Sequence, residues 1–378
     1  MKIIGLELFQ ISIPFAKPYK LSKVYGTRYD AGAVIFKVYT DEGFVGLGEA
    51  DPLNPFTEET PASVMVVTRD IIAPHIIDQD LTSVAKLETH LDGVVHGNPV
   101  ARGAVNMALF DIFGKMINVP AHILLGGKVH DKLPLFRGIG SGTPEEDAVA
   151  IQKEIEIGHR CIMIKMGSLP ISDEIKRLIA AQQNFGGQLR FIVDANQGWE
   201  VSEALAFIDG IRDCRPDLIE QPINRKNIDG LKRIRERSLC PLSADESLVT
   251  IHDATTLVRE QAVDVFSLKV SKNGGLSKTK KIGEMADAFG LKCLMNSMLE
   301  FGITQAASLQ VGCTLTNLMD LGHAYGSVLR MSADVTDFAQ NISDGIVTVP
   351  RGAGLGVALD ESKLKKYTLE HLKIGRIP

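Results

Sequence analysis

The fold of this chain is decided between residues 161 and 220, where three apolar runs each end in a charged residue. The runs read Cys161-Ile-Met-Ile-Lys165, Phe191-Ile-Val-Asp194 and Asp217-Leu-Ile-Glu220. Short apolar runs separated by amphipathic stretches predict strands that alternate with helices. Helical periodicity is clear in residues 202–212 and 277–289, so the alternation predicts an α/β fold with a parallel sheet.

The same alternation continues on both sides of this stretch. Strand-like runs recur at spacings of 24 to 29 residues, near Phe136, Met163, Ile192, Leu218, Ser243, Ser267, Cys293 and Met319. Eight strand–helix units of this length predict a (β/α)8 barrel. A doubly wound sheet also alternates strands and helices, but eight even units favour closure into a barrel.

The residues before the barrel predict a small α+β domain, because strand patterns come first and helical patterns follow. Asp41-Glu-Gly43 marks a hairpin turn between two strand-like runs, and residues 98–118 have apolar side chains at helical spacing. A last strand-like run, residues 345–350, is expected to return to this domain. We therefore predict an N-terminal capping domain over residues 1–125, a barrel over 126–340 and a returning C-terminal segment over 341–378.

Composition restricts the class of protein. The 378 residues include 41 Lys and Arg against 46 Asp and Glu, a net charge of −5, so no basic field for nucleic acid is expected. The longest uncharged run, residues 301–319, is about half apolar, which argues against a membrane-spanning helix. Five cysteines without a CxxC pair argue against a disulfide framework and favour a cytoplasmic location.

Polar side chains end five consecutive strand-like runs. Lys165, Asp194 and Glu220 end the runs quoted above, Asp245 ends Leu242-Ser-Ala-Asp245, and Lys269 ends Val265-Phe-Ser-Leu-Lys269. Catalytic groups of barrel enzymes lie at the carboxyl ends of the strands. We therefore expect these five residues to surround one site.

Strand periodicity predicts which neighbours share the barrel interior with the two lysines. Lys165 shares a face with Cys161 and Met163, and Lys269 shares a face with Val265 and Ser267. The alternate residues, Ile162, Ile164, Phe266 and Leu268, are expected to face the helices.

The three carboxylates of Asp194, Glu220 and Asp245 would repel one another without a cation, and at least one would take up a proton. Oxygen ligands suit a hard ion, so Mg²⁺ is the expected cofactor, with Mn²⁺ as the alternative. Lys165 and Lys269 lie on opposite strands of an eight-stranded ring, so they would flank a bound substrate. This arrangement favours removal of a proton next to a substrate carboxylate, with the cation stabilising the resulting enediolate. One lysine would be the base, and the other would be the acid or a stabilising cation.

Seven further residues are candidates for substrate contacts or for supporting positions around the site. They are Met163, Asn196, Gln221, Glu246, Met298, Glu300 and Asp320.

These segments resemble the enolase superfamily, specifically its muconate lactonizing enzyme subgroup (the mandelate racemase/muconate lactonizing enzyme family). The resemblance covers nearly the whole chain and rests on Gly48-Glu49-Ala50, Asp194-Ala-Asn196, Ile219-Glu-Gln-Pro222, Ala244-Asp-Glu-Ser247, Lys272-Asn-Gly-Gly275 and Met298-Leu-Glu300. It implies that Asp194, Glu220 and Asp245 are the metal ligands and that Lys165 and Lys269 are the acid/base pair. It also implies a symmetric homo-oligomer.

The resemblance further implies that loops at residues 19–29 and 51–57 close over the far end of the substrate. Two departures from the subgroup's pattern concern that substrate. Met163 stands where the subgroup usually has the first lysine of Lys-x-Lys, which removes a positive charge beside the second. Asp320-Leu-Gly322 stands where dipeptide epimerases have Asp-x-Asp. Glu300 matches the cycloisomerases but recurs in relatives with other activities.

The leading hypothesis is a Mg²⁺-dependent isomerase that acts on a small-molecule carboxylate through an enediolate. It would either racemise or epimerise an α-carbon or carry out a muconate-type cycloisomerisation. A dehydratase of a hydroxy acid or hydroxylated amino acid would use the same intermediate. A Schiff-base aldolase would use Lys165 or Lys269 covalently, whereas a non-catalytic ligand-binding barrel would require the five polar positions to be accidental.

Overall fold

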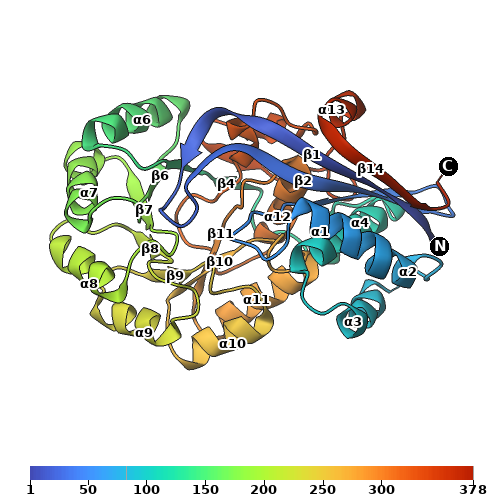
Figure 1. The fold of residues 1–378 in the computed structure, drawn as a ribbon, viewed down its shortest axis with the longest axis horizontal. Coiled ribbons are helices and arrows are strands. Elements are labelled where there is room, and N and C mark those ends of the chain that lie inside the picture. Colours follow the sequence, from blue (N-terminus) through green and yellow to red (C-terminus); the bar gives the residue numbers. More distant parts are fainter. Residues whose placement is uncertain (82, 378) are drawn as a thin grey trace.

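The computed structural model describes residues 1–81 and 83–377. An antiparallel sheet with helices forms the capping domain, and a curled parallel sheet with an outer ring of helices forms the barrel. Figure 1 shows the barrel on the left and the capping domain on the right, with two long strands, β1 (Ile3–Lys20) and β2 (Thr27–Thr40), reaching from one to the other. The barrel with a capping domain confirms the predicted fold class.

The capping sheet has the strand order β14-β1-β2-β3, with β3 at Val45–Ala50 and β14 at Thr368–Gly375. The predicted hairpin at residues 41–43 is confirmed, because β2 pairs with β3 in antiparallel fashion. The strands β1 and β2 extend further than the sequence predicted. The pairing register of β1 and β2 shifts between Pro14 and Tyr19, a segment that contains Pro18. Beyond this shift the hairpin continues to a tip at residues 21–26.

The helices of the capping domain follow β3. They are α1 (Pro61–Val67), the π-helical turn η1 (Thr68–Ile72), α2 (Ala73–Ile76), α3 (Val84–Val94), α4 (Pro99–Met116) and α5 (Ala121–Leu124). The predicted helix at residues 98–118 is confirmed as α4, which packs on β3 so closely that a Cβ atom at Gly48 would lie 2.0 Å from the carbonyl oxygen of Ala104. Because strand side chains alternate, the next residue, Glu49, projects from the other face of β3.

In the described part of the chain, the barrel sheet has seven parallel strands in the order in which they occur. They are β5 (Phe136–Ile139), β6 (Cys161–Lys165), β7 (Arg190–Asp194), β8 (Leu218–Glu220), β9 (Leu242–Ala244), β10 (Val265–Leu268) and β11 (Lys292–Met295). The helices between and after them are α6 (Pro144–Ile157), α7 (Ile171–Phe185), α8 (Val201–Gly210), α9 (Ile228–Arg237), α10 (Ile251–Arg259), α11 (Leu276–Ala288) and α12 (Gly302–Gly312).

The eighth strand position differs from the prediction of a regular strand near Met319. Here Leu318 forms a parallel bridge with Cys293 on one side, and His323 forms one with Leu135 on the other. A bend at residues 320–321 separates the two bridges. The ring therefore closes through isolated bridges rather than through a continuous ladder.

The predicted inner and outer faces of the barrel strands are confirmed. One buried cluster fills the barrel interior and consists of Phe136, Cys161, Met163, Ile192, Leu218, Val265, Leu294, Leu321 and Ala324. The alternate residues, including Ile162, Ile164, Phe266 and Leu268, belong to the larger core between strands and helices.

The C-terminal part of the chain returns to the capping domain by a different strand from the one predicted. Residues 345–350 contain β13 (Ile346–Thr348), which pairs with β12 (Ile342–Ser343) and with β4 (Lys132–Pro134) beside the barrel. The expected return of residues 345–350 to the capping domain is therefore wrong, because their backbone pairs with β12 and β4 instead. The strand that returns is β14, which follows α13 (Glu361–Tyr367) and pairs with β1.

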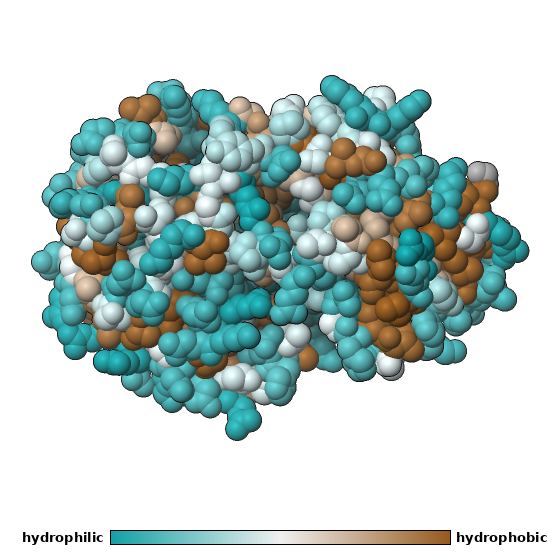
Figure 2. Space-filling view, viewed as in Figure 1, coloured by the Kyte–Doolittle hydropathy of each residue, from teal (hydrophilic) through white to brown (hydrophobic). Residues whose placement is uncertain are grey.

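The surface is mostly polar, with an apolar area over the helices of the capping domain (Figure 2). Val66 and Ile71 are among the exposed apolar side chains there. Within residues 1–81 and 83–377, no helix is long and apolar enough to span a membrane.

Candidate active site

The carboxyl ends of β6 to β10 place the five predicted polar residues around one cavity. Lys165, Asp194 and Lys269 line the cavity, which opens between the barrel and the capping domain. Glu220 and Asp245 are completely buried beside them. The structure therefore brings together all five residues that the strand ends predicted.

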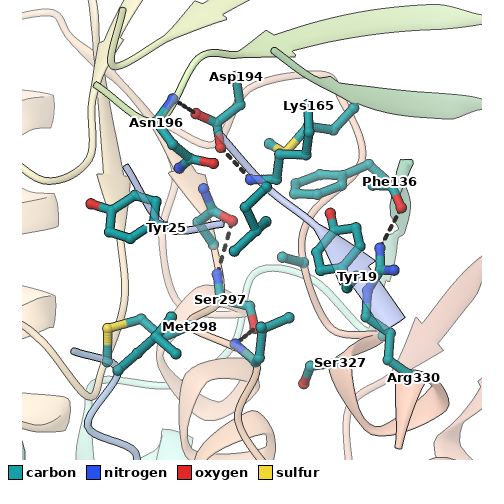
Figure 3. Close-up of a pocket in the computed structure, with 18 of the residues that line it drawn as sticks. Tyr19, Tyr25, Phe136, Lys165, Asp194, Asn196, Ser297, Met298, Ser327 and Arg330 are labelled. Carbon is teal, nitrogen blue, oxygen red and sulfur yellow. Dashed lines mark hydrogen bonds and ion pairs between the residues drawn. The ribbon is translucent and has the colours of Figure 1, made fainter. Parts of the chain in front are cut away.

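On one side of the cavity, Lys165 pairs with Asp194. The Nζ atom of Lys165 donates to Oδ2 of Asp194 (Figure 3). The strand ladder aligns Lys165, Asp194 and Glu220 in one row across three strands. Burial by itself lowers the pKa of Lys165, but the negative charges of Asp194 and Glu220 outweigh it and raise that pKa. Lys165 is therefore an ammonium group in this arrangement.

On the opposite side, Lys269 pairs with Asp245. Its Nζ atom lies 2.6 Å from Oδ2 of Asp245, and Nζ of Lys272 lies 2.8 Å from Oδ1. Burial opposes the charge on Lys269, but Asp245 and Glu246 outweigh it and raise the pKa. Burial likewise opposes the charge on Asp245, and the two lysines outweigh it and lower its pKa. Phe56 covers Lys269, with its ring centre 4.1 Å from Nζ.

Glu220 lies between these two pairs, and among the described residues it forms no ion pair. Its Oε1 atom accepts hydrogen bonds from Ser267 Oγ (3.0 Å) and Asn296 Nδ2 (2.5 Å), while Oε2 is buried without a hydrogen-bond partner among the described residues. Burial, and then the charges of Asp194 and Asp245, raise the pKa of Glu220 well above its usual range. An additional positive charge beside Oε2 would be needed to keep Glu220 ionised.

These residues fit a hard divalent cation. Asp194, Glu220 and Asp245 offer only oxygen ligands, and the unpartnered oxygen of Glu220 is the position where the charge is missing. In the described ranges no three His, Cys, Asp or Glu side chains are already grouped as a metal site. Two of the three carboxylates pair with lysines instead.

Three of the seven further candidates line the cavity itself. Met163, Asn196 and Met298 are among its lining residues. Met163 lies in the barrel interior two positions before Lys165, as the strand period predicted. Asn196 uses its backbone N–H to donate to Asp194 Oδ1 at 2.8 Å, which fixes that carboxylate.

Three others support the site from behind. Gln221 accepts the backbone N–H of Asp245 at 2.9 Å, so it orients that residue. Glu246 accepts a hydrogen bond from the hydroxyl of Tyr25 at 2.9 Å and thereby ties the capping hairpin to the barrel. Glu300 is buried and accepts the backbone N–H of Met298 at 2.7 Å, which shapes the loop after β11.

The predicted role of Asp320 at the site is wrong. Its side chain is exposed and does not line the cavity. The reason is the position of the bend at residues 320–321. At the bend the chain has not yet reached the mouth of the barrel, because His323, further along, still pairs with Leu135 just before β5. The residues of this segment that line the cavity are Ala324, Gly326, Ser327 and Arg330.

Several lining residues were missed by the analysis of strand ends. The loops expected to cover the substrate contribute Tyr19, Leu21 and Tyr25 from the hairpin tip and Leu53 and Phe56 from residues 51–57. Lys272 does not line the cavity but contacts Asp245, and its spacing after Lys269 was its signal in the sequence. Arg137 and Arg330, in contrast, had no signal in the sequence.

Comparison with known families and proteins agrees with this geometry. Residues 3–126 match the N-terminal domain of the mandelate racemase/muconate lactonizing enzyme family, and residues 146–363 match the enolase C-terminal domain-like family. Together the two matches cover nearly all of the chain.

Relatives of known activity are similar over nearly their whole length. N-succinyl-L-Arg/Lys racemase of Bacillus cereus is 27% identical over 98% of both chains, and its crystal structure superposes with a TM-score of 0.94 over 99% of this chain and 100% of that one. L-Ala-D/L-Glu epimerase of Bacillus subtilis is 30% identical over 94% of this chain and 97% of its own. Muconate cycloisomerase 1 of Pseudomonas putida is 31% identical over 93% of each chain.

Proposed function

The chain belongs to the mandelate racemase/muconate lactonizing enzyme family of the enolase superfamily and is an isomerase of that type, and we propose that it moves a proton on the carbon next to a substrate carboxylate. The proposed reaction is a racemisation or epimerisation of that carbon. Its substrate is a small carboxylate, in keeping with the names of the relatives.

The observation that carries this proposal is the pair of lysines facing each other across the cavity. Lys165 is the last residue of β6, Lys269 directly follows β10, and each donates a hydrogen bond to a carboxylate. A racemase must remove a proton from one face of the α-carbon and deliver one to the other face. In each direction, one lysine would be neutral and act as the base while the other would be charged and act as the acid.

Asp194, Glu220 and Asp245 would hold a divalent cation, on which the family depends, and we assign Mg²⁺ to this site. When bound, the cation would supply the positive charge that stabilises the negative charge developing on the substrate carboxylate. The chain's own contribution is to orient these ligands through Gln221 and Asn196. Support comes from the unpartnered oxygen of Glu220.

Proton exchange in D₂O tests the roles of the two lysines. With a panel of N-acyl amino acids and dipeptides, Lys165→Ala should lose exchange from one stereoisomer and Lys269→Ala from the other, each by about 10²–10⁴-fold. Lys176→Ala, an exposed lysine on α7, is the control and should exchange both at the wild-type rate. Loss of exchange from the same stereoisomer in both variants would contradict the two-base reaction.

A muconate-type cycloisomerisation is the second candidate, because the similarity to muconate cycloisomerase 1 is as high as that to the epimerase. In that reaction a single lysine transfers the proton and the other only stabilises charge. One of the two alanine variants would then retain exchange while the other abolished it.

The environment of the lysines disfavours a Schiff-base aldolase. A Schiff-base aldolase uses its lysine covalently, whereas Asp194 and Asp245 pair with Lys165 and Lys269 and add oxygen ligands beside them, which fits metal-dependent proton transfer. Borohydride treatment with substrate and a chelator should therefore trap no covalent adduct.

A cytoplasmic location and a homo-oligomeric state complete the proposal. Each of the five cysteines is a free thiol in the described structure, which supports a reducing compartment. The exposed apolar side chains of the capping domain support contact with a second copy. Light scattering of the purified protein measures the oligomeric state directly.

A further inference from the structure

Two arginines line the side of the cavity that faces away from the carboxylates. Arg137 lies on β5, and Arg330 ends the short 3₁₀ helix η2 (Ser327–Arg330) after the eighth strand position. Figure 3 shows Tyr19, Arg330 and Ser327 on one side of the cavity and Asp194 and Asn196 on the other. The cavity therefore has a cationic end opposite its proposed metal end.

This end has more positive than negative charge. Arg137 pairs with Glu154, with Nε 3.4 Å from Oε1, and donates through Nη1 to the carbonyl oxygen of Gly326 at 3.1 Å. The field of Arg330 also reaches Glu154. Among residues 1–81 and 83–377, Arg330 forms no ion pair, so two guanidinium groups share one carboxylate.

The backbone and the capping hairpin hold Arg330 in position. Its Nη2 atom donates to the carbonyl oxygen of Gly138, and its guanidinium carbon lies 4.0 Å from the ring centre of Tyr19. A Cβ atom at Gly138 would lie 2.6 Å from the hydroxyl of Tyr19 and 3.1 Å from Nη2 of Arg330. The absence of a side chain at Gly138 is thus what lets both groups approach the strand.

We propose that Arg330 binds a second anionic group of the substrate, at the end remote from the α-carboxylate. The substrate would thus be a dicarboxylate or an acyl or peptidyl amino acid with a distal carboxylate. This inference rests on the proposed function for the placement of the α-carboxylate, but the charge at the arginine end is independent of it.

The chemistry of a guanidinium group favours an anion at this position. A charged group that lines a cavity loses part of its hydration when a substrate enters, and a carboxylate replaces that hydration with charge-assisted hydrogen bonds. A neutral tail would leave the Arg330 charge without compensation. A cationic tail would be repelled by both arginines, so the site should reject it most strongly.

Binding of glutarate and of its monoamide, glutaramate, tests the proposal without any turnover. The two compounds differ only in the charge at one end. In the presence of Mg²⁺, calorimetry should show that the wild-type enzyme binds glutarate about 10- to 100-fold more tightly than glutaramate. Arg330→Met should abolish this preference, and Arg330→Lys should retain part of it. Arg225→Met, which removes an arginine outside this cavity, is the matched control and should keep the preference.

Two results would overturn the proposal. One is equal affinity of the wild-type enzyme for both compounds. The other is an Arg330→Met variant that binds both compounds more weakly by the same factor, since that would indicate that Arg330 only supports the structure. Circular dichroism checks that Arg330→Met is folded. If Arg330→Met is unfolded, the preference of Arg330→Lys for glutarate provides the second measurement.

Turnover separates this proposal from the proposed function. In D₂O, dipeptides that end in Glu should exchange their α-proton faster than the same dipeptides that end in Gln, and Arg330→Met should remove the difference. If no compound exchanges but glutarate still binds preferentially, the proposed function fails and the anion subsite remains. If both dipeptides exchange equally in the wild-type enzyme, the subsite is wrong and the proposed function stands.

Discussion

Of the three proposed metal ligands, Asp245 has the most positive surroundings, because Lys269 and Lys272 contact its two oxygens at 2.6 and 2.8 Å. We predict that Asp245→Asn lowers Mg²⁺ affinity and turnover together, since it removes one of the three charges proposed to hold the cation. Calorimetric titration with Mg²⁺ measures the first effect and a substrate assay the second. Asp213→Asn, at an exposed position, is the control. An Asp245→Asn enzyme with wild-type turnover in dilute Mg²⁺ would contradict the ligand assignment.

Met163 gives a second prediction, which concerns the pKa of Lys165. The two side chains share the inner face of β6, so a lysine at position 163 would place a second ammonium group beside Lys165. Like charges disfavour the protonated form, and the pKa of Lys165 should fall. The limb of the pH–rate profile that reports the base should therefore move to lower pH in Met163→Lys. A limb that stays in place or moves to higher pH would refute the argument.

At the scale of helices and strands, two buried glutamates each bind the N-terminus of a helix. Glu49 of β3 accepts the backbone N–H groups of Phe301, Ile303 and Thr304 at the start of α12, at 2.7 to 3.2 Å. Glu59 accepts those of Val100 and Ala101 at the start of α4, both at 2.9 Å. Glu49 therefore joins the two domains, whereas Glu59 acts within one.

This difference predicts separate effects of the two substitutions. Glu49→Ala and Glu59→Ala each leave buried N–H groups unpaired, so each should lower the free energy of unfolding by about 1–3 kcal/mol. Only Glu49→Ala should also lower kcat/KM, because α12 directly follows the loop that places Asn296 and Met298 in the cavity. Denaturant unfolding and steady-state kinetics measure the two quantities. Equal kinetic losses in both variants would show that stability alone is responsible.

The strands and the site differ in how far the sequence predicts them. Lys165, Asp194 and Lys269 were found because a charged residue that ends an apolar run must lie at the end of a strand. Arg177 was not found, although it is buried and donates to the carbonyl oxygen of Lys165 at 2.9 Å. It lies in an amphipathic helix, where an arginine normally faces solvent. Arg330 was missed for a similar reason, since tertiary packing alone brings its segment to the cavity.

For the molecule as a whole, His323 connects barrel closure to pH. It lies at the seam of the ring, where its Nδ1 atom accepts the backbone N–H of Met295 at 3.2 Å. Burial lowers the pKa of His323 to about 3, so the unfolded chain binds a proton below pH 6.5 that the folded chain does not. Its stabilising effect is complete above about pH 6.5 and is lost as the pH falls toward 3.

The prediction compares the wild-type protein with His323→Asn, which retains a hydrogen-bond acceptor but does not titrate. The wild-type free energy of unfolding should fall more steeply between pH 6 and pH 4, by about 1.4 kcal/mol per pH unit relative to the variant. Denaturant unfolding at several pH values gives this difference. His252→Asn, at an exposed histidine, is the control. A constant difference between wild type and His323→Asn over this range would contradict the buried neutral state.

The pairing of β14 with β1 has a consequence for synthesis on the ribosome. Gly5 pairs with Gly375, so one edge of β1 stays open until translation has reached β14. At about 5–20 residues per second, that interval is roughly 20 to 70 s. During this time the unpaired backbone groups of β1 are available to other nascent chains or to chaperones. The same strand β1 carries Tyr19 to the cavity, so a partner bound to its open edge would act on a strand that lines the active site.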